Sequence, residues 1–168
     1  MSGYGNALFP YWLGNYPPPN PYGSFSSTQS QTVTGANVTT IMTYNNTDVA
    51  SQTYFSGSRI YVQAIGVYRV LSSVQFDTTS GGSQRVTYWY RKNGTNIDNT
   101  ASTFTIANNG ENVGTVEIMV PLLAGDYIEL VMQSSDAGMT AAYSAPSGVA
   151  PNNIPAIPSI ITVIQKIA

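Results

Sequence analysis

The sequence predicts an all-β fold, an antiparallel sandwich of about ten strands, from three observations. Short runs of β-branched and aromatic residues alternate with polar turn residues over residues 28–168, with little helical periodicity. Turn signals recur about every 8–12 residues, a spacing typical of sandwiches and barrels. Asn93-Gly94 predicts a two-residue hairpin turn, because both residues tolerate positive φ. A chain of 168 residues has room for one such domain.

The strands are expected, in chain order, at residues 38–44, 59–63, 66–77, 84–92, 95–97, 102–106, 114–123, 126–133, 139–143 and 159–167. The alternation in 66–77 predicts a core face, since neighbouring side chains of a strand point to opposite sides. That face comprises Tyr68, Val70, Val74 and Phe76. Residues 114–123 and 126–133 are expected to form a hairpin around Gly125.

Residues 1–27 are predicted to be an extended arm rather than part of the domain at 28–168. Five of the chain's ten prolines lie there, and proline at this density disfavours helix and central strand. Burying one aromatic ring would compensate the entropy cost of ordering about three residues, so the two terms nearly cancel over the arm. We therefore expect the arm to be ordered only when most of its rings are buried against a neighbouring molecule. The alternative is packing on its own domain. The expected partner-binding residues of the arm are Phe9, Tyr11, Trp12, Tyr16, Tyr22 and Phe25.

The composition argues against an enzyme. Only 8% of residues are charged, and the chain has no His and no Cys. This excludes histidine-based triads, thiol nucleophiles, disulfides and the usual zinc sites. Glu117 and Glu129 could form a glycosidase-like pair, but their simpler role is to keep an exposed face soluble. We therefore expect no catalytic residue, metal site or cofactor.

The charge pattern also limits the partners. The net charge is −2 and the six Lys and Arg residues form no long run, so no nucleic-acid partner is expected. No stretch of about 18 apolar residues predicts a membrane span. Residues 1–27 lack the basic end and apolar run of a secretory signal, so we expect no export by that route.

Four motifs in a fixed order resemble the jelly-roll superfamily of tumour necrosis factor and complement C-one-q. They are GVYRV (66–70), WYRKNGTNI (89–97), LLAGDYIEL (122–130) and a hydrophobic strand that ends the sequence. QFDTTSGG (75–82), WYRKNG (89–94) and PAIPSII (155–161) are similar to the versions found in virion proteins of bacteriophages and large DNA viruses. The resemblance implies a ten-stranded jelly roll assembled as a homotrimer. No calcium-binding cluster of the complement type is present.

The last predicted strand is apolar on both faces, through Ile160, Ile161, Val163, Ile164 and Ile167. One face could meet the core and the other a neighbouring subunit, or the strand could be buried on both sides of one sandwich. The resemblance favours the trimer. The expected trimer-interface residues are Ile161, Val163, Ile164 and Ile167.

The leading hypothesis is a virion structural protein, a trimeric decoration, cement or minor capsid protein whose arm binds the major capsid protein or another virion protein. The alternative is a receptor-binding or adhesion module at a phage tail or fibre tip. Tyr88, Trp89 and Tyr90 could stack there on a host glycan, although alternate members of this run are expected to face the core. A soluble signalling ligand is disfavoured because the sequence shows no secretory signal and no disulfide. The expected location in either favoured case is the virion.

Overall fold

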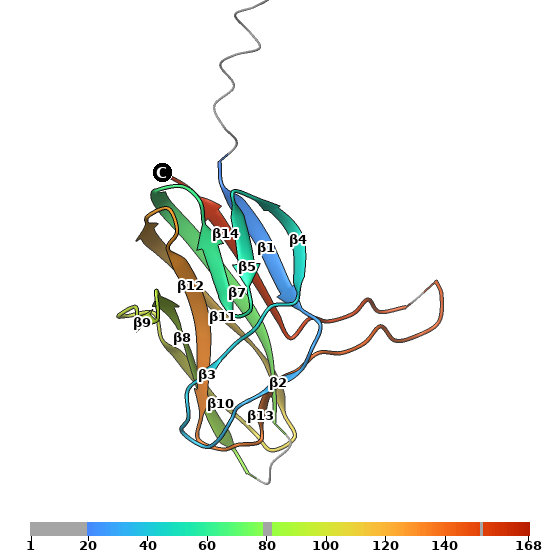
Figure 1. The fold of residues 1–168 in the computed structure, drawn as a ribbon. Helices are drawn as coiled ribbons and strands as arrows, with labels where there is room; N and C mark the ends of the chain where they lie inside the picture. Colours follow the sequence, from blue (N-terminus) through green and yellow to red (C-terminus); the bar gives the residue numbers. More distant parts are fainter. Residues whose placement is uncertain (1–19, 79–81, 152) are drawn as a thin grey trace, which may run out of the picture.

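The structure is a computed structural model and describes residues 20–78, 82–151 and 153–168. Within these described residues, fourteen strands form two antiparallel sheets that face each other (Figure 1). The prediction of an all-β antiparallel sandwich is confirmed. No helix able to cross a membrane occurs in the described residues.

The first sheet is named here the β7 sheet, after its longest strand. Its members are β11 (Glu111–Leu122), β7 (Gly66–Thr78), β14 (Ile160–Lys166), β1 (Tyr22–Ser27), β4 (Asn46–Ser51), β13 (Met139–Ala141) and β2 (Gln31–Thr32). On one edge of β7 lies β11, which pairs with it along its whole length. On the other edge β14 pairs with residues 68–74 and β13 with residues 76–78, so these two strands follow one another along β7.

The second sheet is named the β8 sheet. Its members are β10 (Ser102–Ile106), β8 (Gln84–Lys92), β12 (Tyr127–Ser134), β6 (Arg59–Val62), β5 (Thr53–Ser56), β3 (Thr40–Ile41) and β9 (Thr95–Asn96). Asn93 and Gly94 both have positive φ and join β8 to β9, as the sequence predicts.

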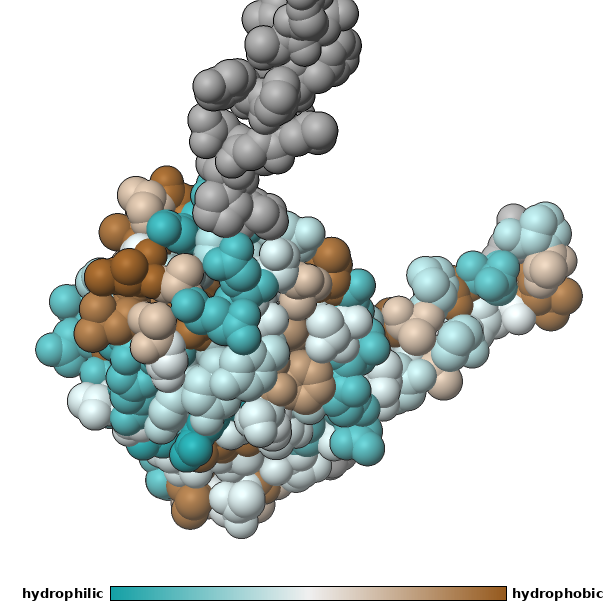
Figure 2. Space-filling view, turned by 45° about the horizontal axis from the view of Figure 1, so that its top comes forward, coloured by the Kyte–Doolittle hydropathy of each residue, from teal (hydrophilic) through white to brown (hydrophobic). Residues whose placement is uncertain are grey.

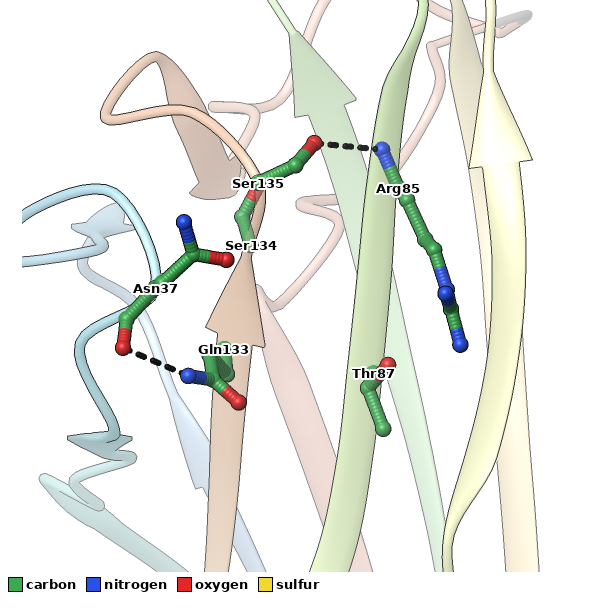
Figure 3. A pocket seen from close by; sticks show the side chains of 6 residues that line it. All are labelled: Asn37, Arg85, Thr87, Gln133, Ser134 and Ser135. Atoms are coloured by element: carbon green, nitrogen blue, oxygen red, sulfur yellow. Dashed lines mark hydrogen bonds between the residues drawn. The ribbon is translucent and has the colours of Figure 1, made fainter.

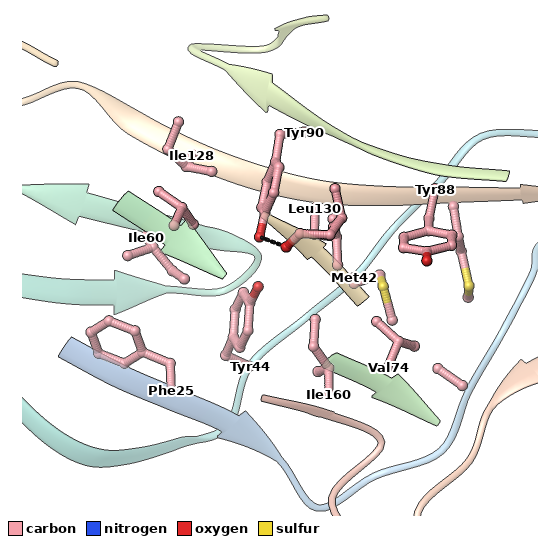
Figure 4. Packing of buried hydrophobic residues seen from close by; sticks show 14 of the residues in the cluster. Phe25, Met42, Tyr44, Ile60, Val74, Tyr88, Tyr90, Ile128, Leu130 and Ile160 are labelled. Atoms are coloured by element: carbon pink, nitrogen blue, oxygen red, sulfur yellow. Dashed lines mark hydrogen bonds between the residues drawn. The ribbon is translucent and has the colours of Figure 1, made fainter. Parts of the chain in front are cut away.

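The core lies between the sheets and is lined by alternate residues of the long strands. The core face expected for residues 66–77 is confirmed, since Tyr68, Val70, Val74 and Phe76 are all buried. From β8 and β12, residues such as Tyr90 and Leu130 face them (Figure 4).

Buried hydroxyl groups link the two sheets inside this core. The hydroxyls of Tyr44 and Tyr90 point toward one another (Figure 4). Tyr44 Oη lies 2.7 Å from Thr162 Oγ1, and Tyr90 Oη donates to Ser72 Oγ at 2.7 Å. Ser72 Oγ and Thr162 Oγ1 are 2.6 Å apart, which closes the chain of contacts. Burial raises the pKa of both tyrosines well above the ordinary range, because an ionised phenol would be poorly solvated there.

The domain begins earlier than the predicted boundary at residue 28. Strand β1 pairs with β14 and β4, and its Phe25 is buried against Phe55 with ring centroids 5.8 Å apart. Gly23 allows this close packing, because a Cβ there would lie 2.5 Å from Thr53 Oγ1. The small polar residues around Phe25 concealed the strand in the sequence.

Three further expectations on the strands need correction. Strands β4 and β5 were not predicted, because Asn, Asp and Ser in residues 46–56 are typical of loops. Regular pairing in the predicted strand 38–44 is confined to β3. The expected hairpin of 114–123 with 126–133 is wrong, since β11 pairs with β7 and β12 with β8. The turn around Gly125 therefore carries the chain from one sheet to the other.

Candidate subunit interface

The outward face of the β7 sheet carries exposed aliphatic side chains on its central strands. On β14, Ile161 and Val163 point away from the core and are 37% and 42% exposed. Val163 lies opposite Leu71 of β7 on one side and opposite Ser24 of β1 on the other. Since directly opposed residues of a sheet share a face, Leu71, Val163 and Ser24 form one row across it.

This row continues to both margins of the sheet. Glu117 of β11 lies opposite Leu71, and Val49 of β4 lies opposite Ser24. A shallow recess of about 80 Å³ opens beside the centre of the row and is lined by Leu71, Val163, Arg69 and Gln165. Leu71 and Val163 bear no charge, so another apolar surface could cover them without burying an unpaired ion. The third central residue, Ser24, is also uncharged, but its hydroxyl donates to the Asp48 carboxylate at 3.0 Å, which places an anion at the β4 end of the row.

An ion pair borders the row. Arg69 Nε donates to Glu117 Oε1 at 2.6 Å, and Arg69 Nη2 donates to Glu117 Oε2 at 3.1 Å. This two-point contact with the guanidinium lowers the pKa of Glu117. Because the two charges already compensate each other, covering this part of the face would cost less than covering either charge alone.

The predicted trimer-interface residues divide between two faces of β14. Ile161 and Val163 lie outward, and Ile167 is exposed just beyond the end of the strand. Ile164 is fully buried in the core, so its assignment to a subunit interface is wrong. The period of two explains the difference, because Ile164 is an odd number of residues from the three outward positions.

The predicted arm residues also divide into two groups. Phe9, Tyr11, Trp12 and Tyr16 lie outside the described residues. Tyr22 and Phe25 belong to β1 rather than to an arm. Phe25 has no exposed surface and cannot bind a partner, so its prediction as an arm anchor is wrong.

The outward face of the β8 sheet is covered by longer aromatic and charged side chains. Tyr54 stacks on Tyr61 at 5.0 Å between ring centroids, and Tyr61 contacts Tyr127 at 5.3 Å. Arg59 lies over the Tyr127 ring at 4.6 Å and donates from Nε to Glu129 Oε1 at 3.1 Å. Glu129 is only 2% exposed. These side chains therefore bury parts of one another without any partner.

The expected sugar-stacking trio is split by strand alternation. Tyr88 and Tyr90 are buried in the core and cannot stack on a ligand. Trp89 alone points outward, and its Nε1 donates to Asn96 Oδ1 at 2.9 Å.

A polar groove of about 270 Å³ lies on the same outward face (Figure 3). It is lined by Asn37, Arg85, Thr87, Gln133, Ser134 and Ser135. Gln133 Nε2 donates to the Asn37 carbonyl at 2.5 Å, and the Arg85 backbone N–H donates to Ser135 Oγ at 3.0 Å. Its lining offers hydrogen bonds and one cation, a set suited to a polar ligand, and no carboxylate or imidazole that could act as a base.

Glu117 and Glu129 lie on strands of different sheets and each is paired with its own arginine. They do not form a two-carboxylate site of the glycosidase kind. Among the described residues, no group of three or more His, Cys, Asp or Glu is placed to hold a metal ion.

Two of the sequence motifs meet at one end of the sandwich. Asp126 accepts hydrogen bonds from Asn93 Nδ2 at 2.7 Å and from the Leu123 N–H at 2.8 Å, and Lys92 Nζ lies 2.9 Å from it. Burial opposes the charge on Asp126, but these contacts outweigh it and lower its pKa to about 2. Asn93 Oδ1 in turn accepts the Tyr127 N–H at 2.9 Å. This contact between the Asn-Gly turn and the Gly-Asp turn could not be predicted from the sequence, because the two turns lie about thirty residues apart in the chain.

An apolar recess of about 430 Å³ lies at this same end, next to the C-terminus. Ile65 and Leu123 on its rim are among the most exposed large apolar residues of the domain, and Ala168 lines it. Brown side chains gather on this part of the surface in Figure 2. The β1 strand starts beside it, because the Lys166 N–H donates to the Pro21 carbonyl at 2.8 Å.

The arrangement of strands is shared with crystal structures of murine APRIL. The structure determined at pH 5.0 superposes with a TM-score of 0.57 at 12% identity, covering 88% of this chain and 99% of that one. The chain has a tumour necrosis factor-like jelly-roll fold. A second murine APRIL structure, at pH 8.0, gives a TM-score of 0.52 with the same identity and coverage. No protein-family model and no curated protein matches the chain.

Proposed function

We propose that the chain is a virion structural protein, a homotrimer that decorates or cements a capsid. The carrying observation is the uncharged row of Leu71, Val163 and Ser24 on the outward face of the β7 sheet, with Ile161 exposed beside it. A face of this kind is suited to burial against a second copy of the chain. The tumour necrosis factor-like fold supports the proposal, as does the low charge of 8%, since a protein whose surface is largely covered needs fewer solubilising charges.

The attachment is proposed to run through residues 1–19. This segment carries no charged residue and is rich in aromatic residues and proline. It joins the domain at the end where Ile65, Leu123 and Ala168 form the apolar recess. We infer that this end faces the capsid, so that the arm and the recess contact the major capsid protein together. The motif resemblance to phage and large DNA virus proteins supports the virion as the setting.

Incorporation into particles tests this function. The full chain is compared with a deletion of residues 1–19 and with a full-length variant in which Phe9, Tyr11, Trp12 and Tyr16 are all changed to Ala. We expect both changed proteins to fold and assemble, because β1 begins only at Tyr22, and both to be lost from purified virions. Wild-type incorporation of either protein would contradict the proposed attachment.

The second candidate is a trimeric recognition module at a tail or fibre tip. The observation that favours it is the polar groove of Figure 3, which shares the outward face of the β8 sheet with Trp89. An aromatic ring beside amide and hydroxyl groups is a common arrangement for a sugar. Binding of the purified protein to host cells, abolished by Trp89→Ala but not by deletion of residues 1–19, would favour recognition. No binding at high protein concentration would favour the capsid role.

A further inference from the structure

The segment between β13 and β14 projects from the domain as a narrow two-stranded ribbon (Figures 1 and 2). Ser144 pairs with Ile157 through two backbone hydrogen bonds of 3.0 and 2.9 Å, and Ser147 pairs with Ile154 at 3.1 and 2.7 Å. We call the described residues of this ribbon, 144–151 and 153–157, the projecting hairpin. An isolated pair of strands is marginally stable in water, so such a ribbon gains from contact with another surface.

The surface of the projecting hairpin is uncharged and partly apolar. Residues 137–165 contain no Asp, Glu, Lys or Arg. Val149 is 83% exposed, and Ile154 and Ile157 are exposed as well. Prolines at 146, 151 and 155 cannot donate backbone hydrogen bonds, so the ribbon is poorly suited to joining the edge of another sheet. Contact through its side chains is favoured instead.

The hairpin leaves the domain from the outward face of the β7 sheet. Its base lies beside Gln75 of β7, between the stretch of β7 that pairs with β13 and the stretch that pairs with β14. The Gln75 carbonyl accepts a hydrogen bond from the Ala142 N–H at 2.7 Å, and the Gln75 N–H donates to the Ser159 carbonyl at 3.0 Å. A small recess at the base brings Gln75 and Asp77, which point outward from β7, together with Ile157. The hairpin and the candidate interface therefore belong to one continuous face.

The length of the hairpin determines how far it extends from the outward face of the β7 sheet. From Ser144 to Val149 the ribbon advances by five residue steps, or about 17 Å at about 3.3 Å per residue. A second sheet packed on the β7 face would lie about 10 Å away. A copy of the chain that covers the β7 face next to the hairpin base would therefore run alongside the hairpin for much of its length.

We propose that the projecting hairpin contacts a second copy of this chain and extends the subunit interface beyond the row of Leu71 and Val163. This inference rests on the trimer of the proposed function. The apolar side chains Val149 and Ile154 pack on the neighbouring subunit, where the absence of charge on the hairpin leaves no ion to desolvate.

Site-specific photo-crosslinking of the full chain tests this contact. Because the chain has no native Cys, Val149→Cys provides a single thiol for a benzophenone maleimide. Thr105→Cys, on the exposed outward face of β10 in the other sheet, is the matched control. After irradiation we expect covalent dimers from the Val149→Cys protein, with the attachment mapped to a second copy, and only background from Thr105→Cys.

A second measurement separates the hairpin from the trimer as a whole. The double variant Val149→Asp with Ile154→Asp should raise the concentration at which the trimer half-dissociates by about tenfold or more, as expected for the loss of a modest apolar contact. Three results together would overturn the hairpin contact while leaving the trimer intact. Sedimentation would show a trimer, crosslinking of the Val149→Cys protein would stay at the Thr105→Cys background, and the double variant would assemble like wild type. A wild-type chain that sediments as a monomer would overturn both.

Discussion

The outward faces of the two sheets differ although the same strand alternation builds both. On the β8 sheet, Tyr54, Tyr61 and Tyr127 pack against one another and Arg59 covers Tyr127. On the β7 sheet the corresponding positions hold short side chains such as Ser24, so Val163 stays uncovered. Long amphipathic side chains can bury one another within one chain, whereas a row of short aliphatic and hydroxyl residues can be covered only from outside.

The largest expected effect comes from removing the strand that completes the β7 sheet. Deletion of residues 1–27 removes β1, its pairing with β14 and β4, and the buried Phe25. Loss of a buried Phe side chain alone costs about 3–5 kcal/mol, so we expect no cooperatively folded domain. Deletion of residues 1–19 should leave the urea midpoint of the domain nearly unchanged. Circular dichroism and urea unfolding distinguish the two, and a folded 1–27 deletion would contradict the assignment of β1 to the domain.

The next effect distinguishes the two faces directly. Val163→Lys places a charge in the uncharged row of the β7 sheet, and Thr87→Lys places one at a matched central position of the β8 face. Since burying an unpaired charge in an interface costs about 2–5 kcal/mol, Val163→Lys should weaken assembly by about a hundredfold or more. Thr87→Lys should assemble like wild type. If sedimentation showed the same degree of assembly for both variants, the β7 face would not differ from the β8 face as a subunit interface.

The interior shared by both sheets should respond to alkali. The unfolded chain loses tyrosine protons near pH 10, while burial keeps Tyr44 and Tyr90 protonated in the fold. The contribution of these two tyrosines to the free energy of unfolding is therefore constant below pH 10. Above pH 10 it falls by about 1.4 kcal/mol per pH unit for each buried tyrosine. The Tyr44→Phe and Tyr90→Phe double variant should show a shallower decline in urea unfolding between pH 9 and 11 at fixed protein concentration. An unchanged slope would be evidence against the burial of these two hydroxyl groups.

The smallest expected effect concerns the turn contacts of Asp126 at the recess end of the sandwich. Asp126→Asn removes the ion pair with Lys92, and loss of a charge-assisted hydrogen bond costs about 1.5 kcal/mol. Because the pKa of Asp126 is lowered to about 2, its contribution is present above pH 4 and is lost as the pH falls toward 2. Urea unfolding between pH 2 and 6 should converge for wild type and variant at the acid end. A constant difference across that range would argue against this ion pair.

Strands with regular alternation could be predicted from the sequence, and strands without it could not. The core face of β7 follows from its period of two, and the Asn93-Gly94 turn follows from its residue types. In β1 and β4, polar residues concealed strands whose pairing depends on neighbours far along the chain.

The candidate interface was partly predictable for the same reason. An apolar β14 predicts that one face meets another surface, but the sequence does not say which face meets the core. Adjacent residues of a strand point to opposite faces, so Val163 and Ile164 cannot both belong to the interface, and the structure places Ile164 in the core. Leu71 joins Val163 only because β14 pairs with β7 at that register. The projecting hairpin has no sequence periodicity, since its proline content resembles that of a loop.

The solution mass of the wild-type protein, measured by sedimentation equilibrium over a wide concentration range, tests the proposed trimer most directly. We expect a particle of three chains, each of 18.0 kDa, because the uncovered row on the β7 sheet needs another copy of the chain to bury it. A single 18.0 kDa species at every concentration, with Val163→Lys indistinguishable from wild type, would contradict it.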